Sequence, residues 1–94
     1  MEPYYRLYVG VDIAAKTFMA TWARDPATAP KAVSFQQTED GFTAFREQLA
    51  TSGVAPEETL VVMEATGSYW IALAVTLHQA GYVVAVLNPA QLHN

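Results

Sequence analysis

Two short apolar stretches, each preceded by a helical pattern, constrain the fold of this 94-residue chain more than any other feature. Thr59–Glu64 and Tyr82–Leu87 have the length of strands and are apolar nearly throughout, which is typical of strands buried on both faces of a parallel sheet. Parallel neighbours need a crossover connection, and Gly67–Ala80, stopped by Gly81, has the length of a helix. We therefore expect a strand–helix–strand unit, with Thr66 or Ser68 as the N-cap of its helix.

The first third of the chain predicts three further strands. Residues 4–14 alternate between an apolar face and a second face, and a tight turn joins them to a strand at Thr17–Ala23. A weaker third strand is expected at Lys31–Gln37, after a proline-containing turn. A hairpin group of this kind is antiparallel.

A helix is expected between the third strand and the first apolar stretch. Thr38 has a side chain suited to an N-cap, and two acidic residues follow it, where the helix dipole favours negative charge. Phe42, Phe45 and Leu49 at helical spacing form its buried stripe, and Gly53 ends it.

Antiparallel strands followed by strand–helix–strand units predict an α/β fold with a mixed five-stranded sheet and flanking helices. The first strand is expected at the centre, with Thr59–Glu64 parallel beside it. This is the topology of the ribonuclease H-like fold. The pattern shows no internal domain boundary, and Asn88 followed by proline opens a helix that the chain does not finish, so the fold is expected to be incomplete at its C-terminus.

Composition and charge exclude several classes of protein. No apolar stretch is long enough to span a bilayer, and the acidic, proline-containing N-terminus is unlike a secretory signal. The absence of cysteine excludes a disulfide scaffold and a thiolate metal site, so a cytoplasmic location is expected. Five basic and nine acidic residues give a net charge of −4, and the basic residues are scattered, so the chain alone should bind nucleic acid poorly.

Asp12 and Glu64 are the candidate catalytic and metal-binding residues. Asp12 lies within an apolar strand, and its neighbours on the same face, Gly10 and Ala14, leave room for an ion or a substrate. Glu64 ends an apolar strand, where ligands of α/β sheets gather. If the strands are neighbours, the two carboxylates can share a Mg²⁺ or Mn²⁺ ion. The alternative is structural: Asp12 accepts N–H bonds from the following turn, and the helix N-terminus stabilises Glu64.

The other polar candidates carry no catalytic role from the sequence. His78 and His93 lack a second ligand at a metal-binding offset, so both are expected to be structural. Lys16 is expected to be a solvated turn residue, and Ser68 has no partnering base in the sequence.

Over nearly its whole length the chain resembles the N-terminal half of the RuvC-like domain of DEDD transposases of the insertion-sequence 110 family. The residues that carry the resemblance are VGVDIAAKT and MEATGSYWIALAVTLHQAGYVVAVLNPAQ. The resemblance implies that Asp12 and Glu64 are the first two carboxylates of the DEDD site. The two remaining aspartates of the DEDD site would follow Asn94, so residues 1–94 are expected to be the N-terminal part of the catalytic domain. Many members carry an acid where Met19 stands.

The resemblance further implies a full-length enzyme that cuts and joins DNA with Mg²⁺ during insertion-sequence transposition. It implies a C-terminal domain with a serine nucleophile, and a structured guide RNA as a partner. Two Mg²⁺ ions carry a charge of +4, whereas Asp12 and Glu64 supply −2. The chain alone is therefore expected to bind at most one divalent ion, weakly, and to cleave nothing.

The Gly67–Ala80 pattern is apolar nearly all round, so cover is expected on both sides of this helix, and a homo-oligomer is the expected state. Two other functions stay open. VGVDIAAKT also resembles the phosphate loop of actin-like sugar kinases and ATPases, although Ala14 and Ala15 give the backbone less freedom than glycine. The chain could equally be a non-catalytic interaction module in which both acids are structural.

Overall fold

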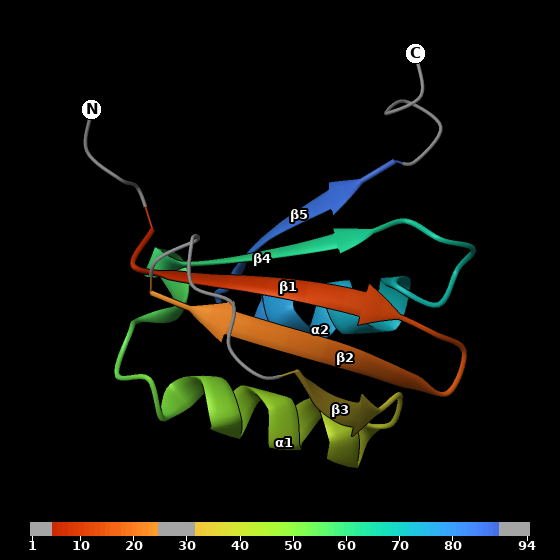
Figure 1. Ribbon diagram of the computed structural model, residues 1–94, viewed down its shortest axis with the longest axis horizontal. Helices are drawn as coiled ribbons and strands as arrows, with labels where there is room; N and C mark the ends of the chain where they lie inside the picture. Colours follow the sequence, from red (N-terminus) through yellow and green to blue (C-terminus); the bar gives the residue numbers. More distant parts are fainter. Residues whose placement is uncertain (1–4, 25–31, 89–94) are drawn as a thin grey trace.

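Five strands form one mixed sheet in the order β3-β2-β1-β4-β5, with β1 at its centre (Figure 1). The computed structural model describes residues 5–24 and 32–88. The strands are β1 (Leu7–Ile13), β2 (Thr17–Ala23), β3 (Val33–Gln36), β4 (Thr59–Glu64) and β5 (Val83–Leu87). β1 pairs with β2 antiparallel and with β4 parallel, and β5 continues the parallel half. The predicted ribonuclease H-like strand arrangement is therefore confirmed.

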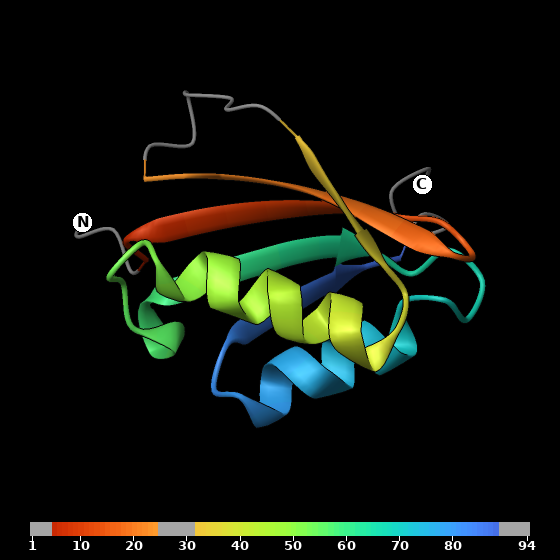
Figure 2. The same cartoon turned by 90° about the horizontal axis from the view of Figure 1, so that it is seen from below.

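Both helices lie on the same face of this sheet, as Figure 2 shows. They are α1 (Glu39–Ala50) and α2 (Ile71–Gln79), and a short 3₁₀ helix, η1 (Pro56–Glu58), leads into β4. The core lies between the sheet and the helices; its largest fully buried side chains are Phe18, Phe45, Leu49, Met63, Leu73 and Leu77. In the described part of the chain, neither helix has the length and apolar character that a membrane crossing requires.

The start of α1 follows the sequence prediction and is packed tightly against β3. The Thr38 hydroxyl accepts a hydrogen bond from the Gly41 N–H at 3.0 Å, as an N-cap does. A Cβ atom on Gly41 would lie 1.9 Å from the carbonyl oxygen of Gln36, so only glycine fits at this contact. Phe42 and Phe45 are buried, as predicted.

The predicted burial of the two apolar strands on both faces is wrong. In β4, Val61 and Met63 are buried, whereas Leu60 and Val62 are partly exposed. No residue of β5 is fully buried, because β5 is an edge strand of the sheet. The physical reason is that α1 and α2 occupy one face, and no described helix covers the other.

The predicted start of α2 is also wrong, because a turn precedes the helix. Gly67 has a φ of +59°, in the left-handed region, and the Trp70 indole N–H donates to its carbonyl oxygen at 3.1 Å. The Ile71 N–H donates to the Ser68 carbonyl at 3.3 Å, and no side chain caps the helix. Neither Thr66 nor Ser68 is the N-cap. The helix expected from Pro89 onward, and His93, lie outside the described residues.

Candidate metal centre at the carboxyl end of the sheet

Asp12 and Glu64 occupy neighbouring positions on adjacent parallel strands. The pairing of β1 with β4 runs in one register to Val11 and Met63, and Asp12 and Glu64 are the next residues of the two strands. Adjacent strands lie about 4.8 Å apart, and residues of equal register in a parallel pair face the same side. The strands that carry the two acids are neighbours, as the sequence predicts.

Both carboxylates lie on the face of the sheet opposite the helices. Val11 and Met63, one position earlier, are buried toward the helices, whereas Asp12 and Glu64 are exposed. The β1–β2 turn and the loop after β4 lie at the same end of the sheet, where β1 and β4 finish (Figure 1). The carboxyl ends of parallel strands are where α/β sheets collect ligands.

Neither carboxylate has a protein partner within residues 5–24 and 32–88. The ion pair of that region, Arg6–Glu58, lies at the other end of the sheet, and no hydrogen bond to either carboxylate side chain occurs within these residues. The turn after Asp12 is closed by the Ala14 N–H, which donates to the Thr17 carbonyl at 2.9 Å, and not by the Asp12 side chain. α2 begins only at Ile71, with Trp70 at the N-cap position, and no side chain caps it. Among the described residues, neither acid therefore makes a side-chain hydrogen bond to the turn or to the start of α2.

Apolar side chains flank the two acids across the sheet. On β2, Met19 pairs with Asp12, and on β5, Leu87 pairs with Glu64. The side chains of Met19 and Leu87 are 45% and 39% exposed. The two carboxylates therefore occupy matching register positions between apolar side chains. A divalent cation with a preference for oxygen ligands fits this donor set.

Two carboxylates make an incomplete metal site. Across the described residues, no group of three or more His, Cys, Asp or Glu side chains could hold a metal ion. A Mg²⁺ ion takes about six oxygen ligands, so water or other groups would supply the remainder. His78 is exposed on α2, and Lys16 and Ser68 are exposed in the loops.

Gln37 is a residue near the site that the sequence did not indicate. Its side-chain amide donates to the Ala14 carbonyl at 3.1 Å and to the Tyr69 carbonyl at 2.9 Å. These acceptors lie 23 and 32 residues away in sequence, so no local pattern could reveal the contacts. The only local signal is that Gln37 precedes the helix cap Thr38.

The comparisons with known proteins agree with this fold. A family model for DEDD transposases of insertion sequence 110, described as "Transposase", matches residues 9–94. An exopolyphosphatase from Cytophaga hutchinsonii is similar in structure, with a TM-score of 0.57 and 14% identity over 90% of this chain and 35% of its own. A Ppx/GppA family member from Aquifex aeolicus has a TM-score of 0.51 and 14% identity over 90% of this chain and 36% of its own. At this identity the likeness shows the fold alone. Among curated proteins, none matches the chain.

Proposed function

Because the chain belongs to the insertion-sequence 110 family of DEDD transposases, we propose that Asp12 and Glu64 are the first two carboxylates of a metal-dependent site that cuts and joins DNA. One observation carries the proposal: the two acids stand at matching register positions of neighbouring strands, exposed and without side-chain partners among the described residues. Residues 1–94 would then be the N-terminal part of the RuvC-like catalytic domain.

The two carboxylates would hold a Mg²⁺ or Mn²⁺ ion between the tips of β1 and β4. Such an ion, when bound, stabilises negative charge on phosphate oxygens. Asp12 and Glu64 are placed by strands whose other faces are packed in the core, so the backbone positions of the two acids are fixed without an ion. Their charge of −2 offsets about one divalent ion, and the chain alone should bind it weakly and cleave nothing.

DNA is the proposed substrate, although the chain carries a net charge of −4. Scattered lysine and arginine residues cannot supply the phosphate contacts that sequence-independent binding needs. We propose that other parts of the full-length transposase provide these contacts, together with a serine nucleophile and a structured guide RNA. The working location would be the cytoplasm.

A homo-oligomer is proposed through the exposed flank of α2 and β5. Ile71 and Val75 on α2 are 46% and 48% exposed, and Val86 on the edge strand is 37% exposed. The molecule is acidic, so copies repel each other unless they meet through an uncharged surface such as this. Sedimentation of the Val75→Glu variant should give monomers where the wild type self-associates; the Thr43→Glu variant, exposed on α1, is the matched control.

A titration of the purified chain with Mn²⁺, followed by NMR, tests the proposed site. Paramagnetic broadening should centre on the ends of β1 and β4, and Asp12→Asn and Glu64→Gln should each remove it. Glu58→Gln, a carboxylate at the opposite end of the sheet, is the matched control and should leave it unchanged. Broadening that survives both site variants would refute the proposal. Thermal stabilisation by ATP would instead favour the actin-like alternative.

A further inference from the structure

We infer that Gln37 is a positioning residue: its side-chain amide ties the turn after Asp12 to the loop after Glu64 and so sets the separation of the two carboxylates. The inference rests on the function proposed for this pair. Gln37 would touch neither a metal nor a substrate, and its hydrogen bonds would hold the two acids in position relative to each other.

The contacts of Gln37 reach both loops at once. One amide proton is donated to the Ala14 carbonyl at 3.1 Å, two residues beyond Asp12, and the other to the Tyr69 carbonyl at 2.9 Å, five residues beyond Glu64. Both N–H donors of the amide are therefore used. A side chain with one donor, or a shorter one, could not make both bonds.

The backbone alone does not join these two loops. The Ala14 N–H bonds within its own turn, to Thr17. The Ala65 N–H donates to Leu87 of β5 at 2.8 Å, and the Thr66 N–H bonds back to the Glu64 carbonyl. Throughout the described residues, no other hydrogen bond connects the β1–β2 turn with the β4–α2 loop.

The backbone of Gln37 is itself fixed, by the β1–β2 turn and by the start of α1, so its side chain can act as an anchor. Its backbone N–H donates to the Lys16 carbonyl at 2.9 Å. The next residue, Thr38, caps α1, and Gly41 in the first turn of that helix presses on the backbone of Gln36. The side chain thus extends from a point held by α1, β3 and the β1–β2 turn to the β4–α2 loop, which is otherwise tied to β5 through Ala65.

Two variants separate the hydrogen bonds from the shape of the side chain. Gln37→Met keeps the length and removes both donors. Gln37→Glu keeps the shape and points carboxylate oxygens at two carbonyl oxygens. Gln48→Met, exposed on α1, is the matched control. Removing a residue that orients metal ligands typically costs about tenfold in affinity, so the Mn²⁺ dissociation constant of Gln37→Met should rise about tenfold, and that of Gln48→Met should stay unchanged.

A distance measurement tests the tie without a metal. The chain contains no cysteine, so nitroxide labels at Ala15→Cys and Ser68→Cys report the separation of the two loops by electron paramagnetic resonance. The distance distribution should broaden with Gln37→Met and stay narrow with Gln48→Met.

The outcomes distinguish this inference from the proposed function. Mn²⁺ binding that ignores Asp12→Asn and Glu64→Gln overturns the proposed site, and the label distances then decide on the tie alone. A narrow distance distribution in Gln37→Met overturns the tie. A broad distribution with wild-type Mn²⁺ affinity at an established Asp12–Glu64 site overturns the positioning role.

Discussion

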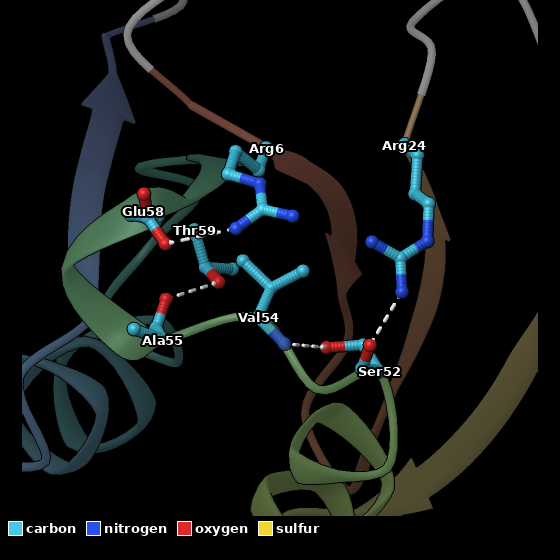
Figure 3. Close-up of polar contacts among 7 residues, drawn as sticks. All are labelled: Arg6, Arg24, Ser52, Val54, Ala55, Glu58 and Thr59. Atoms are coloured by element: carbon cyan, nitrogen blue, oxygen red, sulfur yellow. Dashed lines mark hydrogen bonds and ion pairs between the residues drawn. The ribbon is translucent and has the colours of Figure 1, made fainter.

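The two ends of the parallel half of the sheet treat their charged groups in opposite ways. Where β1 and β4 begin, Arg6 and Glu58 form an ion pair at 3.6 Å (Figure 3). The Arg24 guanidinium donates to the Ser52 carbonyl beside it. The fully buried Thr59 hydroxyl donates to a backbone carbonyl at 3.0 Å. At this end Arg6, Glu58 and Arg24 therefore each have a polar partner.

Where the same strands finish, Asp12 and Glu64 are exposed, adjacent and without protein partners among the described residues. Glu58 thus has a stabilising ion pair at one end of the sheet, whereas Asp12 and Glu64 have no stabilising side-chain contact at the other end. Groups held in that way are available to a ligand. The difference supports the proposal that the carboxyl end of the sheet is its functional end.

Gly41→Ala should have the largest effect on stability, because it separates α1 from β3, the two elements that hold Gln37 at the carboxyl end of the sheet. The new Cβ would overlap the Gln36 carbonyl oxygen at 1.9 Å, so α1 must move away from β3. We expect a loss of about 3 kcal/mol in the free energy of unfolding, measured by urea denaturation.

Gly10→Ala is the matched control for this substitution. A Cβ at Gly10 would meet only the Thr21 hydroxyl oxygen, at 3.6 Å, which is an ordinary contact. Alanine in a strand is favoured over glycine by about 0.5–1 kcal/mol, so this variant should be unchanged or slightly more stable. Equal losses for the two variants would contradict the close contact at Gly41.

Thr59→Val should have the next largest effect, at the amino end. Valine fills the same volume but removes one of two donors to the Ala55 carbonyl, the hydroxyl at 3.0 Å, and leaves the Glu58 N–H at 2.9 Å. The expected cost is about 1 kcal/mol in urea denaturation, with Mn²⁺ binding unchanged. Thr43→Val, at an exposed position of α1, is the control. A change in Mn²⁺ affinity with Thr59→Val would show that the two ends are coupled.

Tyr82 should make the amino end sensitive to alkaline pH. Burial raises the pKa of its phenol above the ordinary value of 10.0, and the nearby Arg46 charge partly opposes this. An acid with a raised pKa in the folded state contributes stability that is complete below the unfolded pKa and is lost as pH rises through the folded pKa. The free energy of unfolding should therefore fall above about pH 10.

The matched variant is Tyr82→Phe, which removes the titrating group. Urea denaturation between pH 8 and pH 11 should show a shallower loss of stability for this variant than for the wild type. Superimposable pH profiles would contradict the role of the buried phenol.

Local patterns predicted much of this fold. The bounds of β2 and β4, the Thr38 cap and the buried stripe that includes Phe45 all depend on residues close together in sequence, and the structure shows them as expected. The adjacency of the strands that carry Asp12 and Glu64 followed from the handedness and order of the units.

Features set by distant parts of the chain could not be predicted in the same way. An apolar run such as β4 indicates burial but not which element covers each face, so the open face was missed. The start of α2 was missed because Gly67 adopts a positive φ, which sequence spacing does not show. The Gln37 contacts join segments that come together only in the folded chain.

The sharpest comparison of the two ends exchanges one acid at each for its amide. Glu58→Gln removes one side of an exposed ion pair, so it should lower the free energy of unfolding by less than about 1 kcal/mol. Glu64→Gln removes repulsion from Asp12, so it should raise that free energy, also by less than about 1 kcal/mol. Both changes should shrink in 1 M salt, where charges are screened within about 3 Å.

Added Mn²⁺ should reverse the sign of the stability change caused by Glu64→Gln and leave that of Glu58→Gln unaltered. An ion that binds only the folded chain raises its stability, so millimolar Mn²⁺ should stabilise the wild type and the Glu58→Gln variant but not Glu64→Gln. Urea denaturation with and without Mn²⁺ measures all three proteins under one set of conditions. If Glu64→Gln lowered stability without the ion, Glu64 would have a stabilising partner in the fold, and the contrast between the two ends would fail.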